Sequence, residues 1–231
     1  MIDLAKPALD VGLYTNNRDS ALAFWGTTVG LPYSELLRVG AGVQQHRHLI
    51  GESVLKINHS RNPLGAAAAG GIRAISIARS YTEDAAEAII DSRPMQDPDG
   101  NVVVLTPAAG GVEQLRVHLT VSNLAQHQDF YGSAIGLPAM SDHIFCCGVS
   151  QIELVEGEAQ HDPEQRAPGY RYLTVQVFDV KQTHKDILAG GGREGMAPVK
   201  LGDVAHISFV RDPDGNWIEI SQRKSLTGSL D

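Results

Sequence analysis

The stretch Asp212-Pro213-Asp214-Gly215-Asn216-Trp217-Ile218-Glu219-Ile220 decides the fold, because its first part occurs twice in the chain. The same Asp-Pro-Asp-Gly-Asn motif occupies residues 97–101, where it is also followed by apolar residues. The motif is typical of a type I turn that leads into a strand. Its recurrence predicts an internal repeat, and a repeat of this size determines the architecture of the whole chain.

A second set of residues recurs at one constant offset. Asn17, Phe24-Trp25 and Gly30-Leu31-Pro32 return as Asn123, Phe130-Tyr131 and Gly136-Leu137-Pro138. In both copies, an aromatic pair lies on the apolar face of an expected helix, and the glycine ends that helix. The second half of the chain therefore repeats the first.

The pattern of strands and helices within each half indicates two similar modules. A short strand, expected at 10–15 or 116–121, precedes the helix with the aromatic pair, and alternating strands such as 53–58 and 150–155 follow it. A second strand and helix then begin near residues 71 and 169, with helices expected at 83–91 and 180–189. The order βαβββ is thus expected four times.

Small residues between positions 106 and 111 predict the boundary between the halves. We expect two domains, residues 1–110 and residues 111–231. Each is expected to fold from two neighbouring modules into an incompletely closed eight-stranded half-barrel of the α+β class. Its concave face would hold the functional site.

Composition excludes some classes of function. The chain of 231 residues has a formal charge of −8 and a pI near 5.5, so a general affinity for nucleic acid is not expected. No run approaches the roughly 18 apolar residues of a membrane span, and the N-terminal residues lack the features of a signal peptide, which predicts a cytoplasmic protein. The adjacent Cys146 and Cys147 are interpreted as reduced thiols. A small molecule is the expected partner, and the sequence leaves open whether two copies of the chain form a homodimer.

Together the repeated motifs resemble those of the vicinal oxygen chelate superfamily, which includes glyoxalases, bleomycin resistance proteins and extradiol dioxygenases. The resemblance extends over nearly the whole chain. It implies a cup-shaped sheet in each domain, and in catalytic members a divalent ion held by His, Gln or Glu from the first and last strands of the modules. Fe, Mn, Zn or Ni would be such an ion, although inert members of the superfamily bind none.

The resemblance assigns Asp10, Lys56, Ala74 and Val104 to the ligand positions of the first half. This set does not chelate a cation, because Ala74 and Val104 have no donor and Lys56 brings its own positive charge. The first domain is therefore expected to be non-catalytic. His46 and His48, which would share one face of a strand, leave a separate metal site open there.

The same positions in the second half are Arg116, Glu153, Tyr172 and Glu219. The expected metal ligands are Glu219, Glu153 and His118. His118 would replace Arg116 as a ligand, because it follows Arg116 by two residues and shares its strand face. The alternative is a salt bridge between Arg116 and Glu219. In either case a cation must join the two carboxylates, because close carboxylates repel each other.

The expected roles leave three functions open. Tyr172 and His118 are candidate catalytic groups, while Arg116 and His206 are candidate substrate-binding residues. The first hypothesis is a metal-dependent lyase, isomerase or oxygenase that acts on a small molecule with vicinal oxygens. The second is a metal-free binding protein that uses the same cup. The third is a metal-free catalyst with Tyr172 and His118 as acid and base. Standard extradiol chemistry is not expected, because it requires two histidines and one glutamate around iron.

Overall fold

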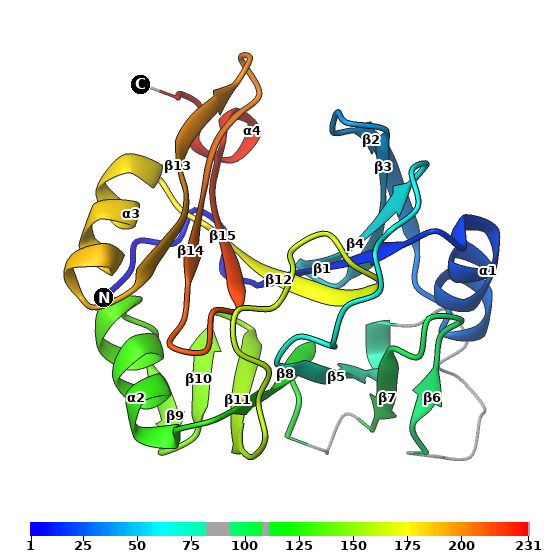
Figure 1. The fold of residues 1–231 in the computed structure, drawn as a ribbon, viewed down its shortest axis with the longest axis horizontal. Coiled ribbons are helices and arrows are strands. Elements are labelled where there is room, and N and C mark those ends of the chain that lie inside the picture. The colour runs from blue at the N-terminus through cyan, green and yellow to red at the C-terminus, as the bar shows by residue number, and fades with distance from the viewer. Residues whose placement is uncertain (82–92, 108–110, 231) are drawn as a thin grey trace.

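The computed structural model of the chain describes residues 1–81, 93–107 and 111–230. Within these ranges the strands form two unclosed mixed sheets, and the helices lie outside them (Figure 1). The α+β class predicted from the sequence is therefore confirmed. The expected helix at 83–91 and positions 108–110 of the expected linker lie outside the described residues.

The eight-stranded sheet has the order β13-β14-β15-β12-β1-β4-β3-β2. Its strands are β1 (Asp10–Thr15), β2 (Tyr33–Arg38), β3 (Val43–Ile50), β4 (Ser53–Ser60), β12 (Gly169–Gln176), β13 (Arg193–Leu201), β14 (Ala205–Arg211) and β15 (Trp217–Arg223). In Figure 1, β12 and β1 cross its middle, and the other strands rise on either side as two arms. The sheet is therefore strongly curved, with one concave face.

The seven-stranded sheet has the order β6-β7-β5-β8-β11-β10-β9. Its strands are β5 (Ile72–Ala78), β6 (Met95–Gln96), β7 (Val102–Thr106), β8 (Leu115–Val121), β9 (Ala139–Ser141), β10 (Ile144–Cys147) and β11 (Ser150–Glu156). It lies below the eight-stranded sheet in Figure 1. Its core-facing residues join those of the other sheet in one large apolar cluster.

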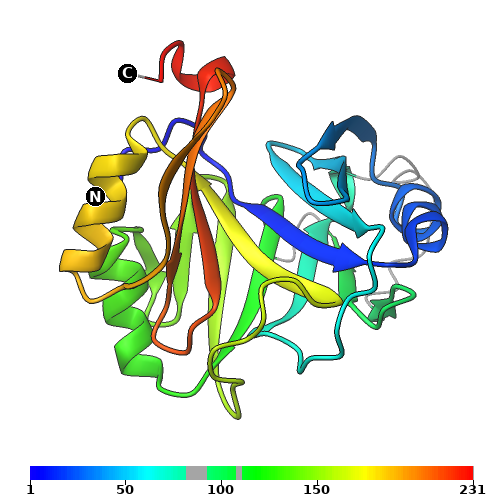
Figure 2. The ribbon, with the colours of Figure 1, turned by 45° about the horizontal axis from the view of Figure 1, so that its top comes forward.

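The pairing of modules differs from the expectation. Neighbouring modules were expected to share a sheet, but β1 pairs with β12 and β5 pairs with β8, both antiparallel (Figure 2). The first module thus joins the fourth, and the second joins the third. Neither sheet consists of one half of the chain. The repeat identifies the modules, but it does not identify their partners, because every module offers a similar strand edge.

The helices are short and end as the repeat predicts. They are α1 (Arg18–Ala23), η1 (Phe24–Thr28), η2 (Arg79–Tyr81), α2 (Leu124–Asp129), η3 (Phe130–Ala134), α3 (Val180–Ala189) and α4 (Lys224–Thr227). The stretches η1 and η3 are π-helical turns that carry the aromatic pairs. Gly30 and Gly136 follow them with φ of 77° and 84°, a conformation that favours glycine.

The repeated turn and the repeated aromatic pair contact each other. The Trp25 indole Nε1 donates to Asp97 Oδ2 at 3.1 Å, and the Tyr131 hydroxyl donates to Asp212 Oδ2 at 3.1 Å. Both aromatic side chains are fully buried. Each bond ties the helix of one module to the final turn of the next, which explains why the two motifs recur together. In the described part of the chain, no helix is long and apolar enough to cross a bilayer.

Candidate functional site

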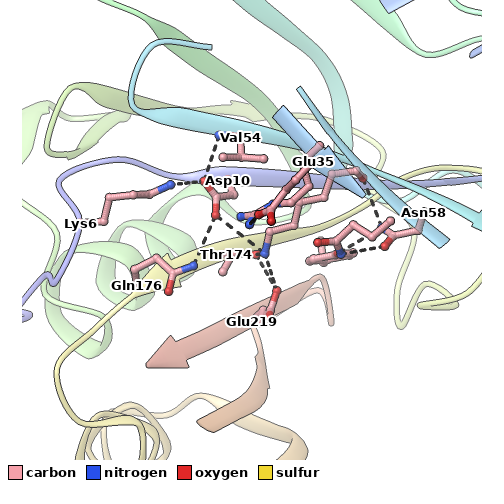
Figure 3. A network of polar contacts seen from close by, with 12 residues as sticks. Lys6, Asp10, Glu35, Val54, Asn58, Thr174, Gln176 and Glu219 are labelled. Atoms are coloured by element: carbon pink, nitrogen blue, oxygen red, sulfur yellow. Dashed lines mark hydrogen bonds and ion pairs between the residues drawn. The ribbon is translucent and has the colours of Figure 1, made fainter. Parts of the chain in front are cut away.

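The concave face of the eight-stranded sheet carries a continuous row of polar side chains. The strand registers pair Glu35 with Arg47, Arg47 with Lys56, and Thr174 with both Asp10 and Glu219. Side chains of paired residues point to the same face of a sheet. Strands from the first and fourth modules therefore bring their polar residues together at its centre (Figure 3).

Lys56 is the centre of this row and is almost completely buried. Its ammonium donates to Thr174 Oγ1 at 2.7 Å and to Glu219 Oε2 at 2.8 Å, and it lies 3.8 Å from Asp10 Oδ2. The Thr174 hydroxyl also donates to Glu219 Oε2, at 2.7 Å. The buried cation is therefore held by three oxygens that come from three strands.

Asp10 is the most deeply buried acid of the cluster, with no exposed surface. Its carboxylate accepts hydrogen bonds from the Lys6 ammonium, from the Val54 backbone N–H at 3.0 Å and from Gln176 Nε2 at 3.4 Å (Figure 3). Burial by itself raises the pKa of Asp10, but the charges of Lys6, Lys56 and Arg47 lower it further than burial raises it. Asp10 is therefore ionised at neutral pH.

Aromatic rings lie beside the polar row. Tyr14, Tyr172 and Phe209 form a buried cluster that Trp217 packs against, with ring centroids about 6 Å apart. A Cβ atom on Gly12 would lie 2.1 Å from the Tyr172 ring, so only glycine lets this ring lie against β1. The Tyr172 hydroxyl accepts a hydrogen bond from Asn58 Nδ2 at 3.0 Å. Burial raises the pKa of Tyr172 well above its ordinary value, which does not suit a catalytic base.

Two arginines lie at the same face. Arg47 pairs with Glu35 through Nη1 at 2.6 Å, but its buried Nε has no partner among the described residues. Arg223, on β15, is half-buried, and the charges of Arg47 and Glu35 are near its guanidinium. Burial lowers the pKa of Arg223, and the neighbouring charge of Arg47 lowers it further. Positive charge at this face is thus incompletely neutralised.

The residues at this face do not fit the divalent ion that the resemblance implies. The ligand positions hold Asp10, Lys56, Thr174 and Glu219, and the Lys56 ammonium is where an ion would contact Glu219. An ammonium has three donors and no lone pair, so it competes with an ion for the same oxygens. The oxygens of Asp10, Thr174 and Glu219 that an ion would need already lie around this ammonium.

The concave face of the seven-stranded sheet brings a second group of residues together. His118 Nδ1 lies 2.8 Å from Glu153 Oε2, and His118 Nε2 lies 2.7 Å from Ser76 Oγ. Arg116 donates from Nε to Gln151 at 2.7 Å, and its Nη1 lies 3.8 Å from Glu153. Burial lowers the pKa of His118, while the Glu153 carboxylate raises it in part, and the pKa is lower than usual overall.

This second group does not fit a divalent ion either. It offers one imidazole and one carboxylate, and both imidazole nitrogens already have a partner. Among all described residues, no group of three or more His, Cys, Asp or Glu side chains is placed to hold a metal ion.

The structure separates residues that were expected to converge. Arg116, His118 and Glu153 lie on the seven-stranded sheet, whereas Tyr172 and Glu219 lie on the eight-stranded one. The expected salt bridge between Arg116 and Glu219 is therefore wrong, since Lys56 pairs with Glu219 instead. The cause is the pairing of the first module with the fourth. Because Glu153 and Glu219 lie on different sheets, no shared cation is needed to join them, and each carboxylate has its own basic neighbours.

Sequence reasoning missed Thr174 and Ser76, and it misplaced His206. Thr174 and Ser76 lie two residues after the assigned Tyr172 and Ala74, on the same strand faces. His206 pairs with Gln222, on the opposite face of β14 and β15 from Glu219. There it lines a pocket of about 350 Å³ beside α3. His127 is fully buried beside Asp212 and Asp214.

His46 and His48 are buried on β3, but they do not share a ligand set with an acid. Both rings pack against Tyr33, with centroids 6.3 and 5.4 Å away. Burial, followed by the charge of His46, lowers the pKa of His48 to about 4. Within the described residues, their contacts are those of packed strand side chains.

Burial of neutral His48 predicts a pH-dependent stability. Between about pH 6.5 and 4 the unfolded chain binds a proton at this residue and the folded chain does not, so the free energy of unfolding falls as the pH falls. Between pH 7 and pH 5, the free energy of unfolding of the wild type should fall by roughly 2 kcal/mol more than that of a His48→Gln variant. Urea unfolding at both pH values measures this difference, and equal losses would contradict it.

Comparison with known proteins agrees with this architecture. Residues 113–220 match the family model described as Glyoxalase/Bleomycin resistance protein/Dioxygenase superfamily. Two solved variants of glyoxalase I from Zea mays have TM-scores of 0.70 and 0.71. Their sequence identities are 16% and 14%, and the matches cover 93% and 99% of this chain and 92% and 96% of theirs. At these identities the likeness concerns the fold alone.

Two curated relatives match a shorter part of the chain. A protein of Vibrio cholerae named "Probable lactoylglutathione lyase" is 39% identical over 70 residues, which are 29% of this chain and 49% of that protein. A protein of Vibrio parahaemolyticus with the same name is 40% identical over 65 residues, or 27% and 46%. The chain thus spans about half the length of the curated relatives it matches.

These findings agree on the fold and on the sequence signature of the second half. The chain has four modules in two curved, unclosed sheets. Residues 113–220, a little under half of the chain, match the model of the glyoxalase, bleomycin resistance protein and dioxygenase superfamily, which the repeated motifs also resemble.

Proposed function

We propose that the protein binds a small anionic molecule on the concave face of the eight-stranded sheet, with the Lys56 ammonium in place of a divalent ion. The observation that carries this proposal is the contact of Lys56 Nζ with Glu219 and Thr174 at 2.8 and 2.7 Å. A side-chain cation that is already neutralised by carboxylates leaves no place for an ion that two vicinal oxygens of a ligand could chelate.

The charges and rings around Lys56 indicate the class of ligand. The face carries Lys6, Lys56, Arg47 and Arg223 against Asp10, Glu219 and Glu35, so the cations outnumber the carboxylates by one. The unpartnered Nε of Arg47 and the nearby Arg223 guanidinium suit a carboxylate or phosphate, which accept hydrogen bonds from guanidinium groups. The rings of Tyr172, Phe209 and Trp217 suit a planar or apolar body.

Binding of aromatic carboxylates to purified protein tests this function. We expect benzoate-like ligands to raise the melting temperature of the wild type, and an Arg223→Met variant to bind them at least tenfold more weakly, because a charged hydrogen bond contributes about 1.5–3 kcal/mol. An Arg193→Met variant on exposed β13 is the matched control and should bind as the wild type does. Elemental analysis of the same samples should find far less than one divalent ion per chain.

A second candidate function is a metal-dependent lyase, which the printed names of the two Vibrio relatives favour. It requires one tightly bound divalent ion per chain that a Glu219→Gln variant loses. Lyase turnover that depends on such an ion would contradict the binding function.

A further inference from the structure

We infer that the concave face of the seven-stranded sheet carries a metal-free acyl-transfer site, with Ser76 as nucleophile, His118 as general base and Glu153 as a positioning residue. This site lies on the opposite sheet from Lys56, and it goes beyond the proposed binding function. The three side chains come from β5, β8 and β11, which the pairing of the second module with the third makes neighbours.

The hydrogen bonds fix the position of the imidazole proton. Ionised Glu153 only accepts, so His118 Nδ1 must donate to it across 2.8 Å. In the neutral imidazole, Nε2 then carries the lone pair, and Ser76 Oγ must donate to it across 2.7 Å. Carboxylate, imidazole and hydroxyl thus have the atomic order of an acyl-transfer triad.

Neighbouring residues supply the other parts of such a site. Ser76 and Arg116 are paired residues in the antiparallel ladder of β5 and β8, so both side chains are on the same face. Arg116 uses Nε for Gln151 and Nη2 for the carbonyl of Gly111, while its Nη1 makes no hydrogen bond among the described residues and lies 3.8 Å from Glu153. That donor is available for the negative charge that develops on a substrate oxygen.

Burial limits the substrate to a small acyl group. Ser76 is only 5% exposed, whereas the side chains of His118 and Glu153 are 28% and 22% exposed. A small ester or thioester would reach the hydroxyl past the imidazole edge, and a bulky acyl group would not. Ala74, on the same face of β5, adds little bulk beside the serine.

The chemistry balances without a metal or an oxidant. Ser76 Oγ forms a bond to the acyl carbon as its proton passes to His118 Nε2, and the bond to the leaving oxygen or sulfur breaks as that atom takes the proton. Water then repeats the sequence on the acyl-serine, which releases the acid and restores the hydroxyl. Glu153 stays ionised and holds the imidazole in place throughout.

Labelling with a small fluorophosphonate tests the site, because the probe phosphonylates a serine that a base activates and releases fluoride. We expect mass spectrometry to find one adduct, on the peptide that contains Ser76. The adduct should be absent in Ser76→Ala. Its rate of formation should fall at least 100-fold in His118→Ala and recover in part when imidazole is added. Ser141, an exposed serine on β9 of the same sheet, is the matched control, and Ser141→Ala should be labelled as the wild type is.

Further outcomes separate an active site from a structural hydrogen bond. Glu153→Gln should slow labelling at least tenfold at an unchanged melting temperature, since it removes the acceptor that orients His118. A folded wild type that is not labelled at Ser76 at pH 8, or a His118→Ala variant that imidazole does not rescue, would overturn the inference. Metal content and carboxylate binding do not depend on these results, so this site and the proposed function fail separately.

Discussion

Replacement of Lys56 by methionine is expected to lower the free energy of unfolding by about 3–5 kcal/mol, the loss typical of removing one partner from a buried ion pair. Methionine fills a similar volume, but it removes the ion pair of Glu219 and one of the two lysines beside fully buried Asp10. An unpaired carboxylate is costly to bury because it loses its hydration. Urea unfolding at pH 7 measures the loss.

A control variant and a double variant test whether the lost charge causes the destabilisation of Lys56→Met. Lys200→Met, an exposed position on β13, should change stability by less than about 0.5 kcal/mol. Addition of Glu219→Gln to Lys56→Met should restore part of the loss, because it removes one of the stranded charges. If Lys56→Met is no less stable than Lys200→Met, the ammonium does not hold the cluster together.

Replacement of Lys56 by glutamate is expected to make the stability of the protein depend on a divalent cation. The variant would place three carboxylates together, from positions 10, 56 and 219, beside the Thr174 hydroxyl. Oxygen-rich sets of this kind suit Ca²⁺ or Mn²⁺. At a hundredfold excess over the dissociation constant, an ion stabilises the folded state by about 2.7 kcal/mol. For a chain of this size we expect a rise of roughly 5–10 °C in melting temperature.

The wild type and Lys56→Gln are the comparisons for this gain of function. The wild type should show no rise with the same ion, because its ammonium occupies the position. Lys56→Gln should show a smaller rise than Lys56→Glu, since it lacks the third negative charge. An equal rise in the wild type, or none in Lys56→Glu, would show that this position is not where an ion would bind.

The sequence predicts the modules well because their local signals are strong. Gly30, Gly136 and the two Asp-Pro-Asp-Gly-Asn turns lie where the repeat places them, and Val180–Ala189 is the expected helix. The reason why the two motifs recur together appears only in the three-dimensional structure. Trp25 reaches Asp97 and Tyr131 reaches Asp212 across module boundaries, and no local propensity encodes such a contact.

The site was harder to predict for two physical reasons. A strand has a period of two residues, so Tyr172 and Thr174 share a face, and the sequence does not show which of them meets Glu219. Which modules pair is decided by contacts between distant strands. Lys56 was assigned to the first cup and Glu219 to the second, whereas the structure pairs the two side chains.

The crossed pairing of modules also orders the folding of the chain. The seven-stranded sheet uses a continuous stretch from Ile72 to Glu156, whereas the eight-stranded sheet joins strands as distant as Asp10 and Arg223. Contacts of high sequence separation form late because closing a long loop costs entropy. During synthesis, the edge of β1 that pairs with β12 therefore stays unpaired until β12 has been made. A second copy of the chain can offer the same β12, so exchange of the last module between two chains would give a domain-swapped dimer with unchanged contacts.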